Sequence, residues 1–349
     1  MSDRGHEPST ADREGKSLNF GPRRFVSALA LMLVLAIVGA GVGIVSRGGS
    51  LDLSVWNPVA PRWLILAFVV AVADILLGGW RLYVLAHRIE PKVRFLDCVR
   101  ANLGNYCLAG LTPSQAGGGA AQLYILARAG LPWSAGVAIA TINFLASILV
   151  LCLAGLFAVF AFSGALPEWL RWSTTGTVAL FGILVVALGA LLRWGSFAPD
   201  SESLQKAGRV KRWILTAGRF LHDSLEIARG LFKRHPRRTA WTFPLTTGIY
   251  TSKLVFTYCV FQAFGPQGAF SDMVGALIVM VLALYFAPTP GASGLAEGAT
   301  TAYLAGSLGT SAAAGFALWW RALAVYGPVV TGGLVILAQL AKEGKPRGD

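Results

Sequence analysis

The amino-acid sequence predicts an all-α polytopic membrane protein with about six full spans, two re-entrant or broken helical hairpins and an inverted repeat. The first observation is composition: 55% of the 349 residues are hydrophobic and 13% are charged, and the mean hydropathy is +0.60. A soluble domain carries about a quarter charged residues. The second observation is a series of apolar stretches, and the third is a similarity between the two halves of the chain. The composition excludes a soluble globule, a disordered chain and a collagen-like chain.

Six apolar stretches approach or exceed the length of about 20 residues that a helix needs to cross a bilayer. In chain order they are 25–45, 63–86, 133–162, 174–193, 239–265 and 311–340. No convincing small-residue cleavage site follows the first stretch, so we expect an uncleaved helix rather than a signal peptide.

Two further apolar segments are broken by turn residues. Segment 99–130 is interrupted at 111–119, and segment 273–309 is interrupted at 288–294. Each arm has about 13–15 residues and reaches about 20–23 Å, which is short of the bilayer core of about 30 Å. We expect re-entrant hairpins, which survive at membrane depth when they are buried in protein or line a wet cavity. Two complete helices at each break would preserve the same topology and remain an alternative.

Positive charge is concentrated in particular connections. The net charge is +13, and segment 193–238 holds eleven Lys and Arg against four Asp and Glu, whereas 163–172 and 266–272 are nearly free of Lys and Arg. Basic connections of membrane proteins lie in the cytoplasm. We therefore interpret the charge as topology rather than nucleic-acid binding, and expect both termini to be cytoplasmic.

This topology gives one transmembrane domain, 25–340, built of two halves. The predicted parts are a polar cytoplasmic N-terminus at 1–24, halves at about 25–162 and 174–340, a basic cytoplasmic loop at 194–238 and a cytoplasmic tail at 341–349. The basic stretch 205–238 has apolar residues at helical spacing, namely Ile214, Leu221, Leu225, Ala228 and Phe232. It therefore predicts an interfacial amphipathic helix on the anionic leaflet.

The two halves contain similar motifs at a nearly constant offset. Thr112-Pro113 in the first half is similar to Thr289-Pro290 in the second, and Tyr124 is matched by Tyr303 at almost the same offset. The two breaks therefore occupy corresponding positions in halves that enter the membrane from opposite sides. That pattern is typical of an inverted repeat, whose breaks point to a substrate site near the midplane. The alternative is coincidence in a chain rich in Gly and Ala.

Ionisable residues inside predicted spans are costly and usually functional. Asp74 and Lys253 each lie in the middle of a span, and the repeat offset relates their positions. We therefore hypothesise an ion pair between the halves, with separate polar surroundings as the alternative. Glu297 follows the second break and Arg321 lies in the last span. Arg321 could pair with Glu297 and only fix the hairpin, or grip an anionic phosphate bidentately.

The run Gly117-Gly118-Gly119 could expose backbone N–H groups to an anion, or simply allow close helix packing. No metal-ligand spacing, nucleophile motif or dinucleotide fingerprint occurs in the sequence. We expect no enzyme activity, no cofactor and no nucleic-acid partner. The candidate substrate-binding residues are Asp74, Pro113, Gly117, Gly118, Lys253, Pro290, Gly291, Glu297 and Arg321.

Three motifs together resemble one family. They are 113–119 followed by Leu123-Tyr124-Ile125-Leu126, then 288–297, then Leu318-Trp319-Trp320-Arg321 with Tyr326. The chain resembles, over about 25–340, the lysylphosphatidylglycerol synthase transmembrane-region family, a flippase-like family of integral membrane proteins. The chain departs from the family pattern in its first half, where Gly119 and Gln122 stand at positions that often hold Glu and Arg, and Asn143-Phe144 replaces an acidic–Arg pair. It resembles the membrane part alone, without the soluble synthase domain.

The resemblance implies movement of a lipid, anionic or amino-acid-modified, between the leaflets of a bacterial plasma membrane. Two other classes remain open from the residues themselves. One is a secondary transporter of a small anionic solute, and the other is a non-catalytic membrane partner of a lipid- or glycan-modifying enzyme.

Overall fold

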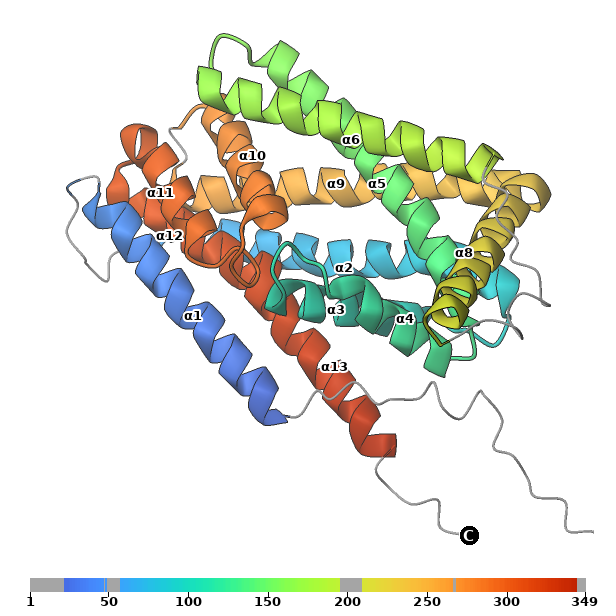
Figure 1. The fold of residues 1–349 in the computed structure, drawn as a ribbon. Coiled ribbons are helices and arrows are strands. Elements are labelled where there is room, and N and C mark those ends of the chain that lie inside the picture. The colour runs from blue at the N-terminus through green and yellow to red at the C-terminus, as the bar shows by residue number, and fades with distance from the viewer. Residues whose placement is uncertain (1–21, 47, 49–56, 195–208, 266–267, 344–349) are drawn as a thin grey trace, which may run out of the picture.

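The computed structural model describes residues 22–46, 48, 57–194, 209–265 and 268–343, and this part of the chain is built of helices without a named strand. The predicted N-terminal segment 1–24, the loop 194–238 and the tail 341–349 therefore lie partly outside the described residues. Figure 1 shows a bundle in which long helices cross one another and shorter helices pack against them. The predicted all-α architecture is confirmed.

Four long helices match predicted spans closely. They are α1 (Pro22–Val45), α2 (Arg62–Ile89), α5 (Trp133–Ala161) and α6 (Glu168–Trp194). Their apolar windows are at most 28% buried within the protein, so most of their surface is available to lipid. The structure begins α6 earlier than the predicted span, because Pro167 and Glu168 provide a favourable helix start that hydropathy does not detect.

The predicted span 239–265 corresponds to α9 (Pro236–Phe264), which is 29 residues long and ends one residue earlier. It is not among the five described helices that are long and apolar enough to cross a membrane by composition alone. Three of its threonines, Thr242, Thr246 and Thr257, are buried, whereas Thr247 and Thr251 are exposed. Because α9 packs mainly against α2 and also against α5 and α12, these three buried threonines meet protein rather than lipid.

Each predicted broken segment forms a helical hairpin. The first consists of α3 (Phe95–Leu111) and α4 (Gly118–Arg128), and the second of α10 (Phe270–Phe286) and α11 (Leu295–Leu308). The two arms of each hairpin pack against each other. Arms of 17 residues span about 25 Å, so the structure favours re-entrant hairpins over pairs of full spans.

The last span is one continuous path through α12 (Thr310–Arg321), a π-helical turn η3 (Ala322–Tyr326) and α13 (Gly327–Glu343). A single π turn inside an α-helix often marks a functional site. Here it begins directly after Arg321 and ends at Tyr326, so the altered winding sets the direction of both side chains.

The amphipathic helix predicted in 205–238 is α8 (Arg209–Arg234), which packs on α5, α9 and α6. The apolar residues of this helix divide between two faces. Leu225, Ala228 and Leu231 are buried, whereas Leu221 and Phe232 are about half exposed. The buried residues Leu225, Ala228 and Leu231 form the stripe that faces the protein.

The helices of the two halves correspond in order. The offset that relates Tyr124 to Tyr303 also places α2, α3, α4 and α5 on α9, α10, α11 and the α12–α13 path, with ends that agree within a few positions. The helices α1, α6 and α8 lie outside this correspondence. The first of them packs on α11 and α12 of the other half, where Gly39 and Gly43 approach the backbones of Gly294 and Gly298.

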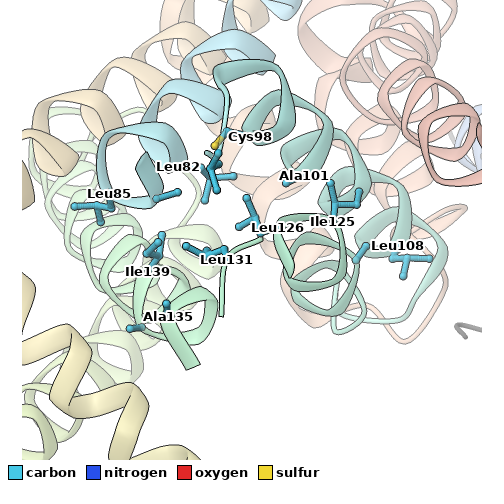
Figure 2. Close-up of a cluster of buried hydrophobic side chains, with 14 of the residues drawn as sticks. Leu82, Leu85, Cys98, Ala101, Leu108, Ile125, Leu126, Leu131, Ala135 and Ile139 are labelled. Atoms are coloured by element: carbon cyan, nitrogen blue, oxygen red, sulfur yellow. The ribbon is translucent and has the colours of Figure 1, made fainter. Parts of the chain in front are cut away.

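Two apolar cores flank the centre. Figure 2 shows the first, where Leu82 and Leu85 of α2 meet Leu126 of α4 and Ile139 of α5. The second joins α9 and α10 to α12 through residues such as Phe261 and Phe316. Both cores fix the hairpins from the side, so the hairpin tips are held at the boundary between the halves.

Candidate functional site

The tips of the two hairpins meet. Pro113 and Pro290 form an isolated antiparallel bridge, and the Ser114 hydroxyl lies 3.5 Å from the carbonyl oxygen of Ala287. These are the Pro residues that the repeat had placed at equivalent positions. The structure therefore brings the two sequence breaks together at the boundary between the halves.

The tip backbones adopt a conformation that side chains disfavour. Ser114, Gln115 and Ala292 have φ values of 49°, 59° and 60°, and Gly291 and Gly294 have values of 55° and 88°. Left-handed backbone at non-glycine residues costs free energy and gathers at functional sites and switch regions. Both tips are therefore strained where they meet.

A cavity of about 150 Å³ lies beside the joined tips. Gly110, Gln115 and Gly291 contribute from the tips, and Asp74 and Lys253 contribute from α2 and α9. Of the predicted substrate-binding residues, Asp74, Lys253 and Gly291 line this cavity, whereas the other six do not.

Asp74 and Lys253 form an ion pair, with the Lys253 Nζ 2.9 Å from Asp74 Oδ2. Two hydroxyls also donate to this carboxylate: Tyr106 to Oδ2 at 2.8 Å and Ser252 to Oδ1 at 2.9 Å. The Lys253 side chain remains 35% exposed, against 12% for Asp74. The carboxylate is thus enclosed by donors, while the ammonium faces the cavity.

Glu297 and Arg321 form a second pair that is closed to the cavity. Both side chains are 0% exposed, and Arg321 Nε lies 2.9 Å from Glu297 Oε1. The Arg321 Nη2 also donates to the Gly291 carbonyl and, at 3.2 Å, to the Ser293 hydroxyl. Arg321 therefore fixes the second tip from the side of the protein interior.

Glu297 completes this arrangement at the start of α11. Its Oε2 accepts the Gly294 backbone N–H at 2.8 Å, and its Oε1 also accepts the Tyr326 hydroxyl. A carboxylate at a helix N-terminus is favoured by the helix dipole and the free N–H groups. The arrangement satisfies the carboxylate within the protein, so these contacts define the shape of the tip.

The glycines of the first tip serve packing and a turn. The Gly117 N–H donates to the Thr112 hydroxyl at 2.8 Å, and a Cβ at Gly118 would lie 2.9 Å from the Cβ of Ala109 and from Asn105 Oδ1. A Cβ at Gly119 would meet nothing within 4 Å. Gly118 thus allows α3 and α4 to approach closely, as small residues do in membrane helices.

The first half lacks a counterpart of the Glu297–Arg321 pair among the described residues. Gln122 accepts a hydrogen bond of 3.2 Å from Asn105, and both amide atoms of the buried Asn143 lack a hydrogen-bond partner in the described part of the chain. The departures from the family pattern at these positions therefore produce a neutral polar region. The two tips are alike in backbone and different in charge.

The sequence interpretation missed residues that the structure adds to the site. Tyr106 and Ser252 bind Asp74, and Arg81, one of the few charged residues within a span, lies two turns along α2 from Asp74. A signal was present, because the pairs Asp74 and Arg81 on α2, and Thr246 and Lys253 on α9, each have a heptad spacing. Such spacing places both members on one helix face.

This arrangement defines an integral membrane protein with two re-entrant hairpins that meet at a charged internal cavity. The model of the lysylphosphatidylglycerol synthase TM region matches residues 25–332, and the chain belongs to that family. No curated protein matches the chain. Among the described residues, no group of three His, Cys, Asp or Glu could hold a metal ion.

Proposed function

We propose that the protein moves a phospholipid or a related lipid between the two leaflets of its membrane. The observation that carries this proposal is the meeting of the hairpin tips, through Pro113 and Pro290, beside a cavity that contains Lys253. Broken helices that meet at the interface of two inverted halves are typical of transport sites. The family membership supports a lipid as substrate.

In this mechanism the headgroup crosses through the central cavity while the acyl chains remain in lipid. The exposed part of the Lys253 ammonium provides a positive charge for a phosphate. Asp74 holds that ammonium in place, and Tyr106 and Ser252 in turn hold the Asp74 carboxylate. Arg321 acts as a positioning residue for the second tip, because its side chain is fully buried and already binds Glu297, Gly291 and Ser293.

An apolar groove on the outer surface supports a lipid rather than a free solute. Leu35, Val38 and Val42 of α1 line it together with Thr289 and Ser293 of the second tip, and its volume is about 400 Å³. The same tip also borders the central cavity through Gly291. An acyl chain in the groove and a headgroup at the cavity would therefore lie on opposite sides of one loop.

The alternative is a secondary transporter of a small anionic solute. The observation that favours it is the modest volume of the central cavity, about 150 Å³. A third class is a non-catalytic partner of a lipid- or glycan-modifying enzyme.

Under the lipid proposal the protein is not an enzyme, its partners are membrane lipids, and it lies in a bacterial plasma membrane with both termini cytoplasmic.

The test is leaflet exchange in proteoliposomes that contain the full chain. Phosphatidylglycerol, lysylphosphatidylglycerol and phosphatidylcholine, each labelled on the headgroup, are followed by accessibility from outside. We expect protein-dependent exchange of at least one of them and its loss in Lys253→Met. The matched control is Lys233→Met, because Lys233 is at the basic end of α8 and does not line the cavity. Absence of exchange by folded protein, with uptake of a small anion instead, would overturn the lipid proposal.

A further inference from the structure

Arg81 is an intramembrane cation without a carboxylate partner among the described residues. It lies about two turns before the end of α2, which corresponds to about 12 Å along the helix. The described structure contains no ion pair between Arg81 and an acidic side chain. Away from the ends of the described spans, Arg81, Lys253 and Arg321 are accompanied by two paired carboxylates, Asp74 and Glu297. One positive charge in the span interiors is therefore in excess.

Two hydroxyl groups hold the Arg81 guanidinium at the junction of three helices. Its Nη1 donates to Ser147 of α5 at 2.8 Å and to Thr246 of α9 at 3.2 Å. The Thr246 hydroxyl donates its own proton to the Thr242 carbonyl at 2.6 Å and is 0% exposed. Its oxygen is therefore fixed as an acceptor, and Arg81 is held toward the interior rather than extended to the headgroup region.

The unused edge of the guanidinium has the geometry of an anion site. Arg81 Nε is buried and has no hydrogen-bond partner among the described residues, and Nη2 forms no hydrogen bond with them. Together Nε and Nη2 present the two parallel N–H groups that bind a phosphate or carboxylate bidentately. A buried charge of this kind is expensive unless a partner compensates it.

The surroundings of Arg81 continue into the central cavity. Its electrostatic neighbours are Tyr250, Tyr106, Asp74 and Tyr285, and all four line the cavity that contains Lys253. Asp74 is already paired with Lys253 and forms no ion pair with Arg81 in the described structure. Thr246 and Lys253 have a heptad spacing on α9, as Asp74 and Arg81 have on α2, so the two polar levels lie about 10 Å apart along the helices.

From this geometry we infer that Arg81, supported by Ser147 and Thr246, is a binding site for a phosphate group, on the side of the cavity that faces the basic helix ends. The inference rests on the proposed function in one respect, since it makes the phosphate of a lipid headgroup the natural occupant. A free phosphate anion offers the same chemistry. The site would receive the phosphate before or after its contact with Lys253.

The test measures binding by native mass spectrometry of the full chain in detergent. The probes are phosphatidylglycerol, diacylglycerol as a lipid without phosphate, and inorganic phosphate as a competitor. We expect Arg81→Gln to weaken the binding of the first phosphatidylglycerol molecule about tenfold or more. We expect Arg81→Lys to weaken it less, because Lys keeps the positive charge but lacks the paired N–H groups of the guanidinium. Arg100→Gln is the matched control, since Arg100 is an exposed arginine paired with Asp97.

Each outcome has a distinct meaning. Unchanged binding in folded Arg81→Gln, or equal binding of diacylglycerol, overturns the site. If Arg81→Gln does not fold, Thr246→Val replaces it and should weaken binding through loss of the hydroxyl support. Binding of inorganic phosphate that is lost in Arg81→Gln, without binding of any lipid, supports the anion site and assigns it to a solute. Leaflet exchange measured on the same variants separates the two proposals, because exchange that survives Arg81→Gln leaves the function intact while it refutes the site.

Discussion

The buried Glu297–Arg321 pair gives the most quantitative prediction. Glu297→Gln keeps the shape and the acceptor for the Gly294 N–H, and removes only the negative charge. Arg321, at 0% exposure, would then be an uncompensated buried cation. Removing one partner of a buried pair typically costs about 3–5 kcal/mol. We expect a loss of that size for Glu297→Gln and for Arg321→Met.

Unfolding by sodium dodecyl sulfate in mixed micelles, followed by circular dichroism, measures this free energy. The double variant Glu297→Leu with Arg321→Met removes both charges, and we expect it to be no less stable than either single variant. Arg100→Met is the control, because its partner Asp97 is at the surface and such pairs contribute about 0–1 kcal/mol. Losses below about 1 kcal/mol for both single variants would refute the assignment of this pair to the support of the hairpin tip.

Two further predictions concern the other elements of the site. Asp74→Lys and Lys253→Asp should each reduce leaflet exchange about tenfold or more. The double variant should restore part of the activity, because two opposite charges again face each other. A double variant that is no more active than the single variants would contradict a functional pair. Gly118→Ala should destabilise the protein by about 1–3 kcal/mol through overpacking of the hairpin arms, whereas Gly119→Ala should be neutral or slightly stabilising, since its added methyl meets open space. Equal effects at the two glycines in the same unfolding assay would show that close packing is not the role of Gly118.

Much of the fold was predictable because it depends on local composition. Long apolar stretches identified α1, α2, α5 and α6, and turn residues at the two breaks identified the hairpins. The span at α9 was predicted from length despite its threonines. This helix is less apolar than the other spans because it packs against α2, α5 and α12. Those neighbours are known only once the fold is known, so the sequence of the segment does not reveal them.

The site was only partly predictable. Asp74 and Lys253 were found because an ionised residue in a span is conspicuous and the repeat offset connects them. Arg81 was overlooked because its position near the end of a span suggests a side chain that extends to the interface. Only the structure shows that Ser147 and Thr246, from two other helices, hold it inward.

The role of Arg321 also depends on tertiary structure. In sequence it is a cation in a span and a candidate for binding phosphate. In the structure its Nε and Nη2 groups donate to Glu297, Gly291 and Ser293, which lie on the preceding hairpin. The path of α11 and α12 brings these partners to Arg321. Residue spacing along a single helix does not predict such contacts between helices.

The most direct test of the central claim is a reversible link between the hairpin tips. Pro113→Cys with Pro290→Cys, in a chain whose four native cysteines are replaced by alanine, places two thiols at paired positions whose Cα separation of about 4.5–5.5 Å suits a disulfide. A headgroup that passes the joined tips requires them to separate, so we predict that oxidation forms the disulfide and stops leaflet exchange, and that reduction restores it. A disulfide that forms while exchange continues unchanged, or tips that never cross-link in the folded protein, would contradict the account.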